Sequence, residues 1–187
     1  MKEKETTQNG RIPFSVNVLI PGRVAPKGRP RFVKNTGAVY TPKATVQSER
    51  EIRSIVAGGK PGAISASYKR IPSDGGKGQG PEAPMVMAGA FFERDVPVRI
   101  RITFYYARPK SPKRKHMTTK PDIDNVIKTV VDAIQRPSEK LPKRFLMMPW
   151  IIEDDAQVVK IEAEKQYAQN DYVLINVARE GEEANGR

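Results

Sequence analysis

The chain has 187 residues, which predicts one domain, and its hydrophobic content of 38% is enough for one compact core. It contains no run of about 18 apolar residues and no apolar stretch behind its charged N-terminus, so we expect neither a membrane span nor a secretory signal. The absence of cysteine excludes disulfides and thiolate zinc sites, and a cytoplasmic protein is the simplest expectation.

Two short segments hold the whole excess of positive charge. Residues 23–53 contain eight basic and two acidic residues, and residues 107–120 contain six basic and none acidic, so each segment contributes +6 to the net charge of +12. A solvated basic face is the ordinary explanation for one such segment. Two segments that carry all of the excess favour a polyanionic partner such as nucleic acid.

The N-terminal half begins with alternating apolar residues that predict a half-buried strand over residues 12–20. A basic loop rich in Gly and Pro follows at 22–37. Thr41-Pro42 then supplies an expected N-cap and a proline at the first helical position, which predicts a helix from about residue 42 to about residue 57. Residues 58–90, rich in Gly, Ser, Pro and Ala, are predicted to be a flexible insertion.

The C-terminal half repeats the order of strand, basic loop and helix. Alternation predicts a strand over 98–106, and the basic loop 107–120 follows it. Pro121 disfavours helix at the residue before it, and apolar residues at three- and four-residue spacing then predict an amphipathic helix to about Gln135. A Pro/Lys loop covers 136–149, and alternation predicts two further strands, at 159–163 and 172–178.

Interleaved strands and helices, with at least one strand that has a polar face, predict an α+β fold in which helices flank a mixed β-sheet. We expect a single domain over residues 12–178. The polar segments 1–11 and 179–187 are predicted to be disordered tails.

The residues available for chemistry are mainly carboxylates, because the chain has a single histidine, His116, and no thiol. Asp122 and Asp124 lie two apart where Pro121 favours extended backbone, so their side chains point the same way, with Cα atoms roughly 6–7 Å apart. They could share one cation, and an aspartate from the acidic cluster 153–155 could complete the site. Mg²⁺ fits such oxygen ligands because it also keeps waters and binds phosphate oxygens.

Each of these charged residues also has an ordinary structural explanation. Asp122 or Asp124 could cap the helix or complement its dipole, and the aspartates at 154–155 could form a turn. Lys128 lies one helical turn after Asp124 and one before Asp132, which is typical of an exposed ion pair. Spacing alone leaves the metal site and these structural roles open.

The order of the two acidic motifs resembles the signature of the RusA family of Holliday junction resolvases. The first motif is Lys-Pro-Asp-Ile-Asp-Asn-Val-Ile-Lys, which begins the segment 120–134, and the second is Asp-Asp-Ala-Gln-Val at 154–158. Pro-Lys-Gly-Arg-Pro-Arg-Phe at 26–32 and Tyr-Thr-Pro-Lys at 40–43 are similar to phage-borne members. The resemblance covers roughly residues 12–57 and 96–178, and the stretches 58–90 and 136–149 are longer than in compact members.

The resemblance implies a Mg²⁺-dependent endodeoxyribonuclease that resolves Holliday junctions by paired symmetric nicks in DNA recombination and repair, with Mn²⁺ able to replace Mg²⁺. It assigns Asp122, Asp124 and Asp155 as catalytic metal ligands. It assigns Lys128, four residues after the second aspartate, as the catalytic lysine. It also implies a homodimer, which would place two active sites on symmetric strands of a four-way junction.

The two basic segments are expected to contact DNA phosphates, which positions the duplex without reading its sequence. The side chains that we expect to make these contacts are Lys27, Arg29, Arg31, Lys113, Arg114, Lys115 and Lys120. Two alternatives stay open at this point. One is a non-catalytic DNA-binding protein, and the other is a metal-dependent nuclease that acts on flaps or forks.

Overall fold

A five-stranded mixed sheet is the centre of the fold in the computed structural model, which describes residues 13–58, 63–68, 90–110, 114, 116–137 and 149–181. The strands lie in the order β4-β1-β9-β6-β8. β6 and β8 are parallel, and the other neighbouring strands are antiparallel. The strand bounds are β1 Pro13–Pro21, β4 Ala63–Tyr68, β6 Val98–Ala107, β8 Val158–Ala168 and β9 Tyr172–Arg179. The predicted mixed sheet is confirmed.

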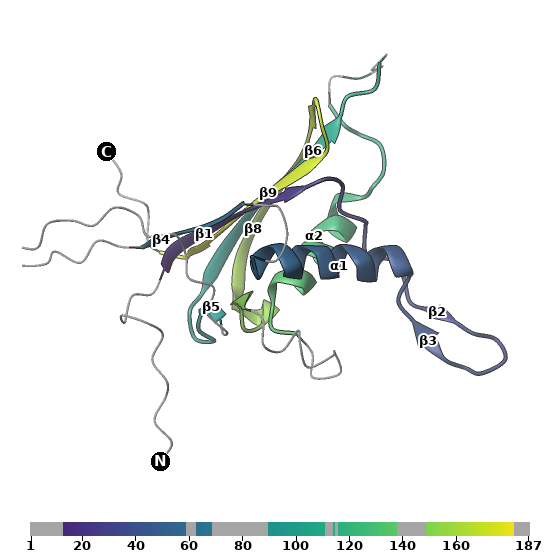
Figure 1. Ribbon diagram of the computed structural model, residues 1–187, viewed down its shortest axis with the longest axis horizontal. Helices are drawn as coiled ribbons and strands as arrows, with labels where there is room; N and C mark the ends of the chain where they lie inside the picture. The colour runs from purple at the N-terminus through teal and green to yellow at the C-terminus, as the bar shows by residue number, and fades with distance from the viewer. Residues whose placement is uncertain are drawn as a thin grey trace, which may run out of the picture.

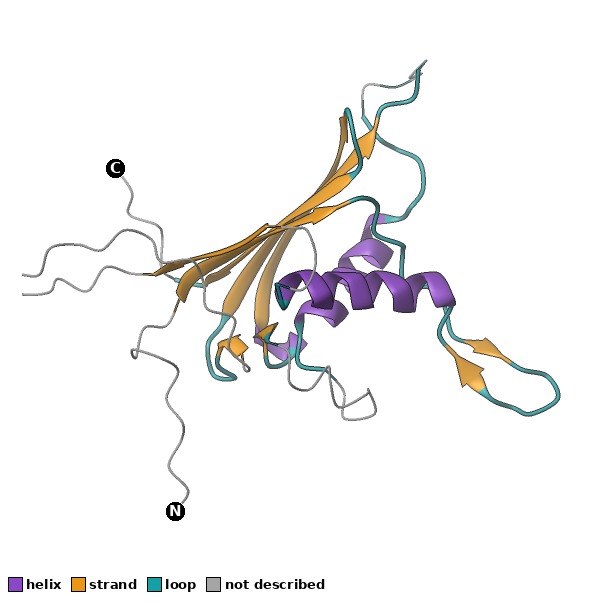
Figure 2. Ribbon diagram, in the orientation of Figure 1, coloured by secondary structure: helices purple, strands orange, loops and turns teal. Residues whose placement is uncertain are grey.

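Two helices, α1 (Lys43–Val56) and α2 (Ile123–Ile134), lie together on one face of this sheet (Figures 1 and 2). The central strands β6 and β9 direct every second side chain toward the helices, as the period of two requires. These side chains meet the apolar stripe of each helix in one buried core. Among its members are Val18, Ile52, Ile100, Ile102, Phe104, Val126, Val130, Ile134 and Ile175.

The connection from β6 to β8 determines where the two ends of α2 lie. Parallel neighbours need a crossover, and α2 is that crossover, so it runs from the C-terminal end of β6 toward the N-terminal end of β8. Near the start of α2, Lys165 of β8 donates to the Pro121 carbonyl at 2.9 Å. Beyond the end of α2, the Arg136 amide donates at 2.9 Å to the carbonyl of Ile152, the last residue of β7 (Trp150–Ile152).

All four predicted strands and both predicted helices are present within a few residues of their expected bounds. α1 begins one residue later than predicted, with Pro42 at the N-cap position and no side-chain cap. Arg179, which was expected in the C-terminal tail, ends β9. The predicted tail 1–11 and residues 182–187 lie outside the described residues.

Several strands have no counterpart in the prediction. β2 (Arg31–Phe32) and β3 (Val39–Tyr40) form a hairpin where a basic loop was expected, and β4 lies within the expected insertion 58–90. β5 (Ala90–Phe92) pairs in parallel with β7. No helix in the described part of the chain is long and apolar enough to cross a membrane.

Candidate active site

Asp122 and Asp124 lie at the first turn of α2. The extended backbone expected across both aspartates is present only at Asp122, because the helix already includes Asp124. Asp122 occupies the N-cap position with extended backbone, φ −69° and ψ 137°, but its side chain makes no capping hydrogen bond. Both side chains are exposed, and neither is paired with another residue in the described part of the chain. The capping explanation therefore does not account for Asp122, and both carboxylates are available to a ligand.

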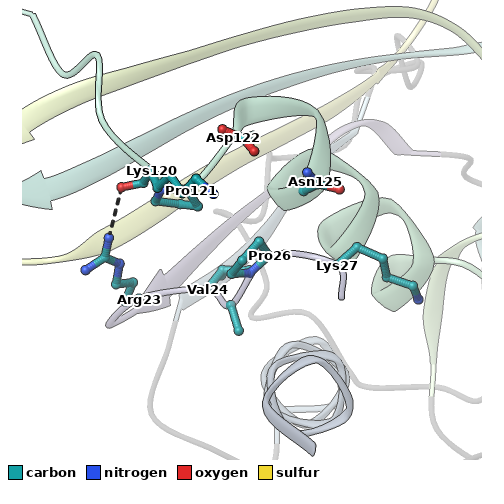
Figure 3. A pocket seen from close by; sticks show the side chains of 9 residues that line it. Arg23, Val24, Pro26, Lys27, Lys120, Pro121, Asp122 and Asn125 are labelled. Carbon is teal, nitrogen blue, oxygen red and sulfur yellow. Dashed lines mark hydrogen bonds between the residues drawn. The ribbon is translucent and has the colours of Figure 1, made fainter. Parts of the chain in front are cut away.

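A groove with a volume of about 510 Å³ lies beside this turn, between the segment 23–27 and the start of α2 (Figure 3). The backbone amide of Lys27 donates to the Asn125 carbonyl at 2.8 Å, and Arg23 reaches the Lys120 carbonyl at 3.5 Å. These contacts join the first basic segment to the first acidic motif. The groove is lined by Arg23, Val24, Ala25, Pro26, Lys27, Lys120, Pro121, Asp122 and Asn125.

The Lys27 side chain turns away from solvent into a cluster of charges. Its ammonium lies 2.6 Å from Glu49 of α1 and 2.6 Å from Asp132 of α2. Burial alone would lower the pKa of Lys27, but the hydrogen bonds to Asp132 and Glu49 outweigh it and raise that pKa above its usual value. Lys27 therefore fastens the wall of the groove to both helices.

Lys128 shares a carboxylate with this cluster. Its ammonium lies 3.3 Å from Asp132, four residues later, so the ion pair expected from the spacing is present. The Lys128 side chain is 60% exposed, so its ammonium stays accessible to a polyanion even while it pairs with Asp132.

Lys165 supports the acidic motif from the edge strand β8. Its ammonium donates to the carbonyls of Thr119 and Pro121, at 2.8 and 2.9 Å. The sequence analysis missed this residue. A signal was available in its position along β8. Lys165 alternates in phase with Ala163 and Tyr167, which pack against the core, and not with Glu162 and Glu164.

The second acidic motif divides into structural and unpaired residues. Asp154 caps the short 3-10 helix η2 (Asp155–Gln157) by accepting from the Ala156 amide at 2.9 Å. The buried Gln157 accepts from the amides of Glu153 and Asp154 at 2.7 and 3.1 Å. The structural explanation therefore holds for Asp154. Asp155 is exposed, and no described residue pairs with its carboxylate.

Asp155 lies at the opposite end of α2 from the first motif. It is three residues beyond Ile152, which follows the helix end, whereas Asp122 precedes the helix. Twelve helical residues separate these ends by about 18 Å. Within the described ranges, no three His, Asp or Glu side chains lie close enough together to hold a metal ion. One chain thus does not bring Asp155 to the predicted ligands Asp122 and Asp124.

The predicted DNA contacts lie at three places. Arg29 and Arg31 are exposed at the base of the β2–β3 hairpin and in β2. Arg114 is exposed and donates to Thr118, and Lys120 is exposed at the groove. Lys27 is engaged in the ion pairs described above. Lys113 and Lys115 lie outside the described residues.

Fold and site together define a basic α+β protein with two unpaired carboxylates at a helix start beside a groove. The family model described as "Endodeoxyribonuclease RusA" matches residues 83–178, just over half of the chain. The chain belongs to the RusA family, as the acidic motifs predicted.

A curated relative, "Crossover junction endodeoxyribonuclease rusA" of Lactococcus phage r1t, is 30% identical over 88 residues. That alignment covers 46% of this chain and 57% of the relative, so the chain spans little more than half of the relative's length. The aligned part includes less than half of this chain, and the basic segment 23–53 lies before the residues that match the family model.

Proposed function

We propose that the protein is a Mg²⁺-dependent, structure-specific endodeoxyribonuclease that resolves Holliday junctions by paired symmetric nicks in DNA recombination and repair. The observation that carries this proposal is the uncommitted carboxylate pair Asp122 and Asp124, beside a basic segment, in a chain of the RusA family. Two unpaired carboxylates would repel a DNA phosphate unless a cation lay between them. A bound metal ion gives these residues a favourable role at a DNA backbone.

Asp122 and Asp124 are the residues that would hold the ion. Both side chains offer only oxygen atoms, both are exposed, and Mg²⁺ commonly takes one or two carboxylates together with waters and phosphate oxygens. Mn²⁺ accepts the same ligands and should replace Mg²⁺. When bound, the ion supplies Lewis-acid activation of water and of the scissile phosphate.

Other residues of the chain would act on the phosphate and on the DNA arms. Lys128, one turn after Asp124, would stabilise negative charge that develops on the phosphate, and its ion pair with Asp132 would limit where its ammonium can lie. Lys27 would contribute mainly through its field, since two carboxylates already engage it. Direct phosphate contacts would come from Arg29, Arg31, Lys113, Arg114, Lys115 and Lys120.

A homodimer completes the proposal. Two coordinated nicks on strands related by two-fold symmetry require two matching sites, and a C2 dimer provides them. The dimer also gives Asp155 a catalytic role. At the far end of α2 it does not reach the carboxylates of its own chain, but it could join Asp122 and Asp124 of a second copy.

Incubation with a synthetic four-way junction, with and without Mg²⁺, tests the proposal. We expect symmetric paired nicks that require the metal. The Asp124→Asn variant should bind the junction as well as wild type, keep its circular dichroism spectrum and fail to cut. If the wild type binds the junction but does not cut it, the protein is a non-catalytic DNA-binding protein. If it cuts only flaps or forks, it is a nuclease with a different branched substrate. Undiminished nicking in excess chelator would reject the metal.

A further inference from the structure

The β2–β3 hairpin stands away from the rest of the molecule beyond the N-terminal end of α1 (Figures 1 and 2). Its two aromatic side chains are open to solvent, with Phe32 74% exposed and Tyr40 46% exposed. The register pairs Phe32 with Val39 and Arg31 with Tyr40, so each face of the ribbon carries one aromatic ring. Two exposed rings on such a short ribbon contribute little to the core of this chain.

An ordered turn holds the two strands of the hairpin together. The Val33 amide donates to the Ala38 carbonyl at 2.9 Å, and the Gly37 amide donates to the Val33 carbonyl at 2.9 Å. Gly37 has φ +66°, a backbone conformation that glycine adopts without strain. The aromatic rings are therefore presented on a defined ribbon.

The base of the hairpin is fastened beside the groove. The Gly28 amide donates to the Thr45 hydroxyl at 3.0 Å, and that hydroxyl donates to the Pro26 carbonyl at 3.1 Å. A Cβ atom at Gly28 would lie 2.6 Å from the Cγ of Pro42, so only glycine allows this close approach. With the Lys27–Asn125 backbone contact, these bonds hold the hairpin in a fixed relation to the start of α2.

The positive charge around the hairpin indicates what kind of partner it binds. Residues 23–48 contain no acidic residue and six basic ones: Arg23, Lys27, Arg29, Arg31, Lys34 and Lys43. A two-fold contact centred on the hairpin would bring two positively charged ribbons against each other, which is unfavourable. Aromatic rings among cations are instead the combination that binds single-stranded nucleic acid, because bases stack on the rings while the cations neutralise phosphates.

We propose that the β2–β3 hairpin binds unpaired bases at the branch point of the DNA substrate, with Phe32 and Tyr40 as the stacking surfaces. The inference rests on the proposed function and deepens it, since it assigns recognition of the open branch to an element separate from the carboxylate pair. The hairpin lies before residues 83–178, which match the family model.

The test measures binding of the full chain in chelator, where no cutting occurs, to a four-way junction with unpaired bases at its centre and to a linear duplex of equal length. Phe32→Ala and Tyr40→Ala should each weaken junction binding by about tenfold or more, the effect of one lost stacked base, and leave duplex binding within about twofold. Val39→Ala is the matched control, because Val39 is 57% exposed on the same ribbon but is not aromatic. Phe32→Trp should retain the affinity.

A 2-aminopurine placed at the branch point reports stacking directly. Its emission should change when wild type binds and should change much less with the Phe32→Ala/Tyr40→Ala protein at saturation. If the folded double variant binds the junction as tightly as wild type, and wild type cuts junctions, the inference about the hairpin is wrong while the proposed function stands. The inference is also wrong if the double variant converts a dimer to a monomer, because the hairpin then forms the interface with a second copy. A wild type that binds neither DNA overturns the proposed function as well.

Discussion

Replacing Lys27 by methionine removes the ammonium that joins the groove wall to both helices. Methionine keeps much of the stem of the side chain but leaves Glu49 and Asp132 without the cation that lies 2.6 Å from each. Asp132 keeps its weaker pair with Lys128 at 3.3 Å. The substitution therefore tests whether Lys27 acts in the structure or on DNA.

The partial burial of the cluster sets the size of the effect. The side chains of Lys27, Glu49 and Asp132 are 26%, 19% and 15% exposed. Exposed ion pairs contribute about 0–1 kcal/mol, whereas breaking a fully buried pair costs about 3–5 kcal/mol. We expect Lys27→Met to lower the free energy of unfolding by about 2 kcal/mol, an intermediate value consistent with these exposures.

Urea unfolding at neutral pH measures this change, followed by circular dichroism and by fluorescence of Trp150, the only tryptophan. With a slope of about 2 kcal/mol per molar urea, the midpoint should fall by about 1 M while the slope stays constant. Lys43→Met is a matched control, because Lys43 is exposed at the start of α1 and pairs with no carboxylate among the described residues. It should change the free energy by less than about 0.5 kcal/mol.

The opposite pattern would refute this reasoning. If Lys27→Met unfolds like wild type but binds a junction weakly, and its log–log salt slope falls by about 0.9, then Lys27 contacts a phosphate. A double-mutant cycle with Asp132→Asn gives an independent measurement. It should show a coupling energy of about 1 kcal/mol if the ion pair acts as described.

Three further predictions concern residues around the acidic motifs. Lys165→Met should slow single-turnover cleavage at saturating protein while junction affinity stays near wild type, because the carbonyls of the Asp122 segment lose their donor; an unchanged rate would contradict this positioning role. Gln157→Leu should lower the free energy of unfolding, measured in urea, by about 2–4 kcal/mol, since four backbone groups lose their hydrogen-bond partner. A decrease of less than about 0.5 kcal/mol would contradict this structural role of Gln157. A mixture of Asp122→Asn and Asp155→Asn proteins should nick one strand if a second copy supplies Asp155, although each variant alone is inactive; no nicking by verified mixed dimers would rule out the shared site.

Local pattern was sufficient to predict the regular elements and the acidic pair. β1 and β6 show the period of two because one face packs on helices and the other meets solvent, and α2 shows the helical period for the same reason. The concentration of positive charge in two segments was likewise visible in order along the chain. Asp122 and Asp124 stand out because both are in one short motif next to a helix start.

Elements that show no pattern of their own along the chain could not be predicted this way. The two-residue strands β2 and β3 are exposed on both faces, so no alternation marks them. β4 is a strand because it pairs with β1 across the sheet, in a stretch of small residues whose composition favours loops. Likewise, Gln157 shows no pattern of its own, since its importance comes from backbone groups of other segments.

The sequence by itself determined the family, the mixed α+β fold and the pairing of acidic motifs with basic segments, because periodicity, charge and motif order are properties of neighbouring residues. Only the tertiary structure decided that Asp154 caps η2 while Asp155 stays unpaired, and that Asp122 and Asp155 lie at opposite ends of α2, a helix about 18 Å long. The physical reason is the crossover. A helix that connects two parallel strands must carry the chain from one end of the sheet to the other, so motifs on its two sides are separated in space.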